Sequence, residues 1–299
     1  MNRLIEFSTA GLPAEQRIAL WEDHNRSALI GLRCRMLSES LFDGTEINLQ
    51  LDRMHVARVR GNAHVVERPA EVIRRNPADA IAVYLAVAGE AFFYHDDGVV
   101  TLRPGQVLIC DADRPFLRGF SRGLEEIAIK VPRATFREVS GLDELRAPLV
   151  REDLSARTLA KLAGRALRDP AADEATLLSL LAAMVNPGHE VGAAHLANAH
   201  AFIDDHLTEI GLNAPRVAGA IGVSERHLSR LFAASGVSLP RFVLSRRLER
   251  AHALLTASPG ATIAGVAAAC GFGSATHFSH AFRARFGLRA SEVRARHAR

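Results

Sequence analysis

The sequence predicts an α+β protein of two domains, with a β-rich N-terminal domain flanked by helices and an all-α C-terminal domain. Three observations predict this architecture. The chain has 299 residues, which is long enough for two domains with separate cores. Short apolar runs separated by turn signals occupy residues 47–130. The same helical pair then occurs twice between Val217 and Phe282.

The N-terminal domain begins with residues 15–32, which predict one or two helices that pack onto the strands that follow. Asp96-Asp97-Gly98 is a strong hairpin signal. The predicted strands include residues 81–87, 91–94, 107–110 and 124–129. Seven or more short strands with closely spaced turns are typical of a sandwich or a small barrel, here over about residues 45–131.

Residues 133–187 predict helices that complete an N-terminal domain of residues 1–187. Two leucine-rich stripes lie in them, at Leu154, Leu159, Leu162 and Leu167, and at Leu177, Leu181 and Met184. The stripes either form a homodimer contact or pack against each other within one chain. Residues 188–195 predict a linker, and residues 196–299 form the C-terminal domain.

Charge differs between the two parts of the chain. Residues 196–299 contain 13 Arg, no Lys and six acids, a net charge of +7, whereas the remainder carries 24 basic and 27 acidic residues, a net charge of −3. A basic domain beside a mildly acidic one favours a polyanionic partner for the C-terminal part. A solvated, arginine-rich surface is the alternative interpretation.

The cysteines and the apolar runs indicate the cellular compartment in which the protein is expected. Cys34, Cys110 and Cys270 are far apart and odd in number, so neither a disulfide framework nor a CxxC metal pair is expected. Cys270 is expected in a helical core. The sequence contains neither the apolar run of a secretory signal nor one of about 18 residues that could span a membrane. We therefore expect a cytoplasmic protein with no membrane partner.

The repeated helical pair is the most informative feature of the chain. The first copy reads VAGAIGVSERHLSRLF and the second VAAACGFGSATHFSHAF, with Gly222 and Gly271 five residues after the opening valines. The openings lie 49 positions apart and the endings 50, so the second turn is expected to be one residue longer. A short helix, a glycine turn and a second helix with one polar face predict a helix-turn-helix unit that binds duplex DNA.

In the first copy, Leu228, Leu231 and Phe232 are expected to face the core. The opposite face predicts base contacts by Arg226, Ser229 and Arg230. Arginine can donate two parallel hydrogen bonds to guanine, which makes Arg226 and Arg230 the principal candidates.

In the second copy, the exposed face predicts weaker base contacts by Ala275, Thr276, Ser279 and His280. Thr276 and His280 stand where the first copy has arginines. Phosphate contacts position a protein without specifying sequence, and we expect them from Arg246, Arg247, Arg283 and Arg285.

The C-terminal third resembles the DNA-binding domain of the AraC/XylS family of bacterial transcription regulators. The residues that carry the resemblance are AIGVSERHLSRLF (220–232), GVSLPRFV (236–243), RRLERAHALL (246–255), TIAGVAAACGFGSATHFSHAFRARFG (262–287) and SEVR (291–294). The resemblance implies seven helices, two helix-turn-helix units and contacts with successive major grooves of promoter DNA. We also expect the protein to be an activator, with RNA polymerase as a partner. The family usually has Pro and Tyr where this chain has Ala290 and Val293.

Residues 75–116 resemble, more loosely, the cupin-like barrel in which such regulators bind a small-molecule effector. Cupin enzymes bind their metal with a His-x-His pair and further acidic and His ligands. In this chain His95 stands alone, and the segment after Pro104-Gly105 contains Cys110, Asp111 and Asp113 but no histidine. We therefore expect no metal, no cofactor and no enzymatic activity. A cupin-type enzyme with a DNA-binding tail and an alkyl-transfer repair protein are alternatives that lack their expected ligand or cysteine clusters. A regulator that is controlled by a protein partner is a further alternative.

An effector would contact inward-facing strand positions. The residues with suitable aromatic, cationic or donor groups are Arg58, Arg60, His64, Tyr84, Phe92 and Tyr94. Such a set suits a small, partly apolar, anionic molecule. The alternative is that the aromatic residues form an ordinary core, because alternation shows which residues share a face but not which face is inside.

Overall fold

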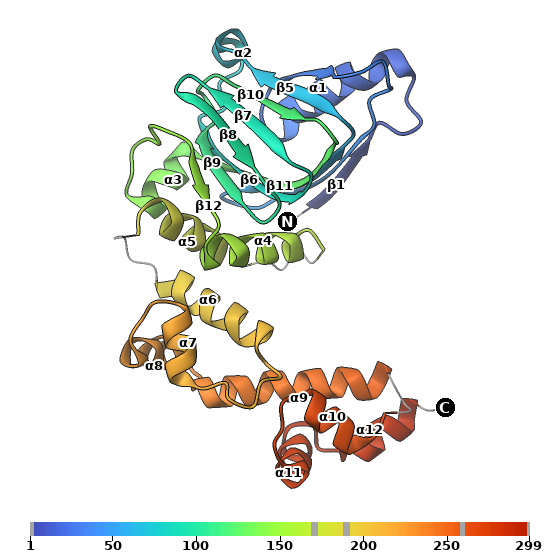
Figure 1. The fold of residues 1–299 in the computed structure, drawn as a ribbon, viewed down its shortest axis with the longest axis vertical. Coiled ribbons are helices and arrows are strands. Elements are labelled where there is room, and N and C mark those ends of the chain that lie inside the picture. Colours follow the sequence, from blue (N-terminus) through green and yellow to red (C-terminus); the bar gives the residue numbers. More distant parts are fainter. Residues whose placement is uncertain (1–2, 169–172, 188–191, 258–260, 298–299) are drawn as a thin grey trace. The chain divides into compact units, whose positions relative to one another are not determined.

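A computed structural model describes residues 3–168, 173–187, 192–257 and 261–297 (Figure 1). The chain divides into two compact units, Met1–Ala194 and His195–Arg299. The first unit is rich in strands and the second is helical, which confirms the predicted fold class. Among the described residues, no helix is both long and apolar enough to cross a bilayer.

The strands of unit 1 form two antiparallel sheets. One has the order β1 (Arg3–Ser8), β3 (Gly44–Gln50), β4 (His55–Gly61), β11 (Leu124–Pro132), β6 (Ala80–Ala88), β9 (Val107–Asp111) and β12 (Leu149–Arg151). The other has the order β2 (Arg33–Met36), β5 (His64–Arg68), β10 (Phe116–Phe120), β7 (Ala91–His95) and β8 (Gly98–Leu102). His95 pairs with Gly98, so the predicted hairpin turn at Asp96-Asp97 is present.

Alternating side chains explain how these strands enclose a core. In β7, Ala91 and Phe93 are buried, while Phe92 and Tyr94, which alternate with them, are exposed. The core between the sheets also receives Trp21 from α1 (Arg17–Ala28), which follows a short 3-10 turn, η1 (Ala14–Gln16). The strands β1, β2 and β12 and the helix α2 (Ala70–Arg75) were not among the predicted elements. They are short, and β1 and β12 lie at the edges of their sheet.

The leucine-rich helices are α4 (Leu154–Ala166) and α5 (Glu174–Val185), which pack on each other, while α3 (Arg133–Ser140) packs on α5. Leu159 and Leu177 are each 1% exposed, and Leu181 and Met184 are equally buried. The second stripe is therefore buried within one chain, whereas Leu154 and Leu162 of the first stripe are half-buried. The homodimer stays a prediction.

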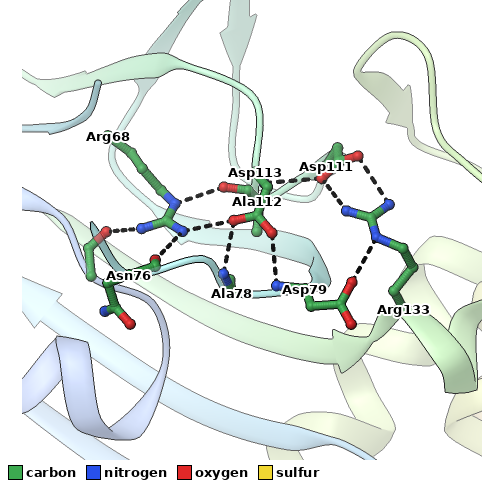
Figure 2. Close-up of polar contacts among 9 residues, drawn as sticks. Arg68, Asn76, Ala78, Asp79, Asp111, Ala112, Asp113 and Arg133 are labelled. Atoms are coloured by element: carbon green, nitrogen blue, oxygen red, sulfur yellow. Dashed lines mark hydrogen bonds and ion pairs between the residues drawn. The ribbon is translucent and has the colours of Figure 1, made fainter. Parts of the chain in front are cut away.

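A fully buried arginine joins the two sheets (Figure 2). Arg68 of β5 donates from Nε to the carbonyl of Ala112 at 2.6 Å, from Nη1 to the carbonyl of Gly31, and from Nη2 to the carbonyl of Asn76 at 2.9 Å. Nη2 also donates to Asp113 Oδ1 at 2.8 Å. Arg68 therefore neutralises a carboxylate and satisfies three buried carbonyl groups at once.

The same polar cluster extends toward α3. Asp113 accepts hydrogen bonds from the amide N–H groups of Ala78 and Asp79, at 2.8 and 2.7 Å. Arg133, the first residue of α3, donates to Asp79 and with both Nη groups to Asp111 (Figure 2). The cluster therefore connects the start of β6, the end of β9 and the start of α3.

Unit 2 contains seven helices in its described residues: α6 (Gly192–Asp205), which begins in unit 1, α7 (Ala214–Ala220), α8 (Glu225–Ala234), α9 (Leu239–Ala257), α10 (Ile263–Ala269), α11 (Ala275–Phe286) and α12 (Ala290–His297). The long helix α9 belongs to two cores. Its N-terminal residues Leu239 and Val243 pack with α6, α7 and α8, and its later residues Leu248 and Leu255 pack with α10, α11 and α12.

Candidate nucleic-acid interface and effector cavity

Both predicted helix-turn-helix units are present. The first consists of α7 and α8 joined by residues 221–224, and the second of α10 and α11 joined by residues 270–274. The second turn is one residue longer, as the unequal repeat offsets predicted. Gly222 and Gly271 have φ angles of 73° and 79°, a conformation that glycine adopts without strain.

Each of the four helices begins with a side-chain cap. Asn213 and Thr262 accept hydrogen bonds from the backbone at the starts of α7 and α10, 3.1 Å in both cases. Ser224 and Ser274 do the same for α8 and α11, at 3.2 and 3.3 Å. Such caps satisfy N–H groups that would otherwise lack a partner, and they fix where each recognition helix starts.

The exposed face of α8 contains Arg226, Ser229 and Arg230, whereas Leu228 and Phe232 are buried in the first core. Leu231, expected in the core, is half-buried. Nη2 of Arg230 lies 3.4 Å from Nδ1 of His227. No carboxylate of the described residues forms an ion pair with these arginines, so their charge is available to a ligand.

The equivalent face of α11 is also exposed. Phe278 and Phe282 are fully buried, and the opposite side presents Ala275, Thr276, Ser279, His280 and Arg283. The Ser279 hydroxyl donates to the carbonyl of Ala275 at 2.9 Å. Arg285 points toward α9, where its Nη2 lies 3.9 Å from Glu249. The face of α11 is therefore less cationic than that of α8.

Arg246 and Arg247 hold helix α9 within unit 2. Arg246 donates from Nε and Nη2 to the two oxygens of Asp204 on α6, at 2.8 and 3.0 Å. Arg247 donates to the carbonyls of Leu207 and Glu209, at 2.9 and 2.7 Å. Sequence reasoning assigned both residues to phosphate contact and missed this role, because their partners lie about 40 positions away.

Unit 1 has a cavity of about 40 Å³ between its sheets. Apolar and aromatic side chains line most of it, among them Trp21, Leu29 and Phe120. The charged lining residues are Arg118, Glu126 and Lys130. The cavity has room for about three water molecules, since a single water needs about 10–15 Å³ of such space.

Arg118 and Glu126 form a buried ion pair in this cavity. Arg118 donates from Nη1 to Oε1 and from Nη2 to Oε2 of Glu126, at 3.0 and 2.7 Å. Its guanidinium lies over the ring of Tyr84, 3.7 Å from the ring centroid. Burial alone lowers the pKa of Arg118, but the Glu126 carboxylate outweighs burial and raises it. Arg118 is therefore charged at neutral pH.

Two of the six predicted effector residues line this cavity, His64 and Tyr84. Burial lowers the pKa of the His64 imidazole, which is therefore neutral at pH 7. Its Nδ1 donates to the carbonyl of Asn62 at 2.7 Å. Burial likewise raises the pKa of the Tyr84 phenol.

The other four predicted effector residues do not face the interior, which corrects the expectation that they occupy inward-facing strand positions. Phe92 and Tyr94 are exposed, because Ala91 and Phe93 occupy the inward positions of β7. In β4 the inward positions belong to Ala57 and Val59. The arginines Arg58 and Arg60 both pair with Glu125 of β11 instead, and Arg60 lines an open groove of about 460 Å³.

Sequence reasoning missed Arg118, Glu126 and Lys130, although alternation contained a signal. Arg118 stands between Phe116 and Phe120 on one face of its strand, and both phenylalanines are buried. A charged residue in an otherwise apolar stripe is unusual, since burial of a charge requires a partner.

The side chains that the sequence offered as metal ligands form ion pairs or are buried in the core. Asp111 and Asp113 pair with Arg133 and Arg68, and no group of three potential metal-binding side chains gathers among the described residues. The pKa values of the Cys34 and Cys110 thiols are raised to about 12, chiefly by burial. Cys270 is buried in the second helical core, as expected.

A strand-rich domain with an internal cavity, followed by two capped helix-turn-helix units, is the architecture of a DNA-binding transcription regulator. Residues 21–210 match the model of an AraC-binding-like domain, and residues 217–296 match that of a helix-turn-helix domain. The chain belongs to the AraC family of transcription regulators.

Relatives and a solved structure agree with this assignment. The transcriptional activator NphR of a Rhodococcus species is 24% identical over 268 residues, which cover 82% of this chain and 79% of NphR. The transcriptional activator RhrA of Rhizobium meliloti (strain 1021) is 32% identical over 93 residues, 31% of this chain and 30% of RhrA. The crystal structure of the AraC-like transcriptional activator CuxR is similar in fold, with a TM-score of 0.53, 20% identity, and coverage of 84% of this chain and 96% of CuxR.

Proposed function

We propose that this regulator activates transcription in the cytoplasm by placing α8 and α11 in successive major grooves of promoter DNA. The observation that carries the proposal is the pair of recognition helices, each with a capped start and an exposed polar face opposite a buried one. An α-helix fits the major groove, where every base pair presents a distinct pattern of donors and acceptors. Relatives described as transcriptional activators support the sign of regulation.

We assign different roles to the two helices. Arg226, Ser229 and Arg230 of α8 read bases, while Ala275, Thr276, Ser279 and His280 of α11 contribute less discrimination. Arg283 is the main phosphate ligand, because Arg246 and Arg247 already have intramolecular partners. Arg285 contributes less, because it lies near Glu249. Phosphate contacts fix the register of the protein, whereas base contacts specify sequence.

This division predicts different defects for two matched substitutions. Arg230→Ala is expected to lower affinity for operator DNA by about 1–3 kcal/mol and to relax preference at one base position. Arg283→Ala is expected to weaken binding to operator DNA and to random DNA by about the same factor. Binding of both variants to an operator and to base-substituted operators, at one salt concentration, measures the difference. Equal losses on all sequences for both variants would contradict the assignment.

We further propose that the cavity of unit 1 belongs to a site for a small organic effector. It is lined by apolar side chains with a few charged groups, the usual composition of a ligand site. Effector binding then alters either DNA affinity or a later contact with RNA polymerase. A second candidate is control by a protein partner, which is favoured by the exposed apolar side chains Phe92, Tyr94 and Val99 on β7 and β8.

The effector proposal predicts a reciprocal coupling. A ligand that raises DNA affinity must itself bind more tightly when DNA is present, by the same factor and typically by about 1–3 kcal/mol. Titration of a ligand with and without operator DNA, beside a transcription assay, measures both routes of action. If saturating ligand alters neither DNA affinity nor transcription, unit 1 acts through a partner or as a scaffold.

A further inference from the structure

The cavity of unit 1 carries a surplus of positive charge. Arg118 and Lys130 each contribute one positive charge and Glu126 one negative charge, so these lining residues sum to +1. His64 adds no charge, because burial lowers its pKa. An uncompensated charge inside a protein favours a ligand of opposite sign. The cavity is therefore suited to an anion with a single charge.

Arg118, which lines this cavity, also has an unused donor. Its Nη1 and Nη2 atoms hold the two oxygens of Glu126, whereas its buried Nε has no hydrogen-bond partner among the described residues. The side chain as a whole is 2% exposed. A buried N–H group without a partner loses the hydrogen bonds that it makes with water.

The geometry of guanidinium allows a second carboxylate on this side. The group has five N–H donors in one plane, and Nε with Nη2 forms a second fork beside the fork that Glu126 occupies. The same fork is used elsewhere in this chain, where Nε and Nη2 of Arg246 bind Asp204 at 2.8 and 3.0 Å. Arg118 can therefore keep Glu126 and still bind an acid.

We propose that the cavity binds a short organic monocarboxylic acid, whose carboxylate docks on the Nε–Nη2 side of Arg118. This inference rests on the proposed effector function and names the chemical class of the effector. The carboxylate brings the net charge of the lining, which includes Lys130, to zero. Glu126 is a positioning residue that holds the guanidinium plane, and the rings of Tyr84 and Phe120 lie beside Arg118.

The size of the cavity selects short acids. Its volume of about 40 Å³ is well below the roughly 150 Å³ of a cavity that holds benzene. A carboxylate with a few carbon atoms is larger than this space, so its binding requires the lining side chains from α1, Trp21 and Asn25, to move. Propionate is therefore a suitable probe, and propionamide is its neutral counterpart of nearly the same shape.

Trp21 makes the test local. It is the only tryptophan of the chain and it lines the cavity, so its fluorescence reports on this site. The full-length chain is titrated with propionate and with propionamide at constant ionic strength. We expect a saturable fluorescence change with propionate at millimolar concentration, and binding of propionamide weaker by about tenfold or more, because a hydrogen bond to a charged group is the stronger one.

A double variant separates binding from folding. Arg118→Met alone would leave Glu126 buried without a partner, so both are replaced together as Arg118→Met/Glu126→Met, an exchange that proteins often tolerate. We expect the double variant to lose at least about tenfold in propionate affinity. Its affinity for propionamide should change much less. Equal binding of acid and amide by the natural chain, unchanged propionate affinity in the double variant, or no saturable response to propionate would each overturn the proposal.

The two proposals fail separately. If propionate binds through Arg118 but changes neither DNA affinity nor transcription, the acid site stands and the effector function is wrong. If a neutral ligand controls DNA binding while propionate gives no response, the effector function stands and the acid site is wrong.

Discussion

Raising the salt concentration from about 50 to 200 mM is expected to weaken DNA binding by the full chain on the order of a thousandfold. Unit 2 supplies the reason, since residues 196–299 have a net charge of +7 without a single lysine. About six phosphate contacts would release their counterions and give a slope near −5 in a plot of log affinity against log salt. Exposed arginines that can make such contacts include Arg241, Arg283 and Arg289.

Two single substitutions sharpen the measurement. Arg283→Gln is expected to reduce the slope by about one, because one phosphate contact is lost. Arg74→Gln removes the same charge from an exposed position on α2 of unit 1, and it should leave the slope unchanged. Fluorescence anisotropy with a labelled duplex at several salt concentrations measures all three proteins. A flat salt dependence of the natural chain would exclude phosphate-driven binding by unit 2.

Replacing Arg68 by Met is expected to lower the free energy of unfolding of unit 1 by about 3–5 kcal/mol. The arginine is fully buried, and its loss leaves Asp113 with less compensation and three carbonyl groups without their donors. A loss of this size corresponds to a fall of roughly 10 °C in the unfolding temperature of a domain of this length. Calorimetry of the full chain, in which the two units can unfold separately, measures it.

An exposed ion pair provides the control for this substitution. Arg33 binds Glu71 at 2.9 Å, but both side chains are nearly half exposed. Arg33→Met is therefore expected to cost less than about 1 kcal/mol. A similar small cost for Arg68→Met would show that the cluster in Figure 2 does not stabilise unit 1.

The same cluster responds to acid in a defined direction. Burial raises the pKa of the Asp113 carboxyl, but hydrogen bonds from Ala78, Arg68 and Asp79 outweigh burial and lower it below its ordinary value of 3.8. A carboxyl with a lowered pKa stabilises the folded state fully above its ordinary pKa. This contribution is lost as the pH falls through the lower value in the folded protein.

The helix-turn-helix pair could be predicted from the sequence because the signals that define it are local. Ser224 and Ser274 cap helices within their own first turn, and Gly222 and Gly271 meet a backbone requirement of their own turns. The apolar spacing of each helix then selects its buried face. Such short-range signals also explain why even the extra residue of the second turn was predictable.

The cavity could not be predicted in the same way. Alternation along β4 and β7 separates two faces, but the second sheet decides which face is buried. That choice placed Arg58, Arg60, Phe92 and Tyr94 outside. It also brought Arg118 of β10, in one sheet, onto Glu126 of β11, in the other.

The sequence by itself therefore determined the two-domain architecture, the repeated DNA-binding unit and the exposed faces of α8 and α11. Only the tertiary structure decided which charges have intramolecular partners. Arg246 is held by Asp204, 42 positions earlier, and Arg68 by Asp113, 45 positions later. Local propensity and periodicity act over a few residues, whereas a buried charge is compensated by whichever segment the folded chain brings beside it.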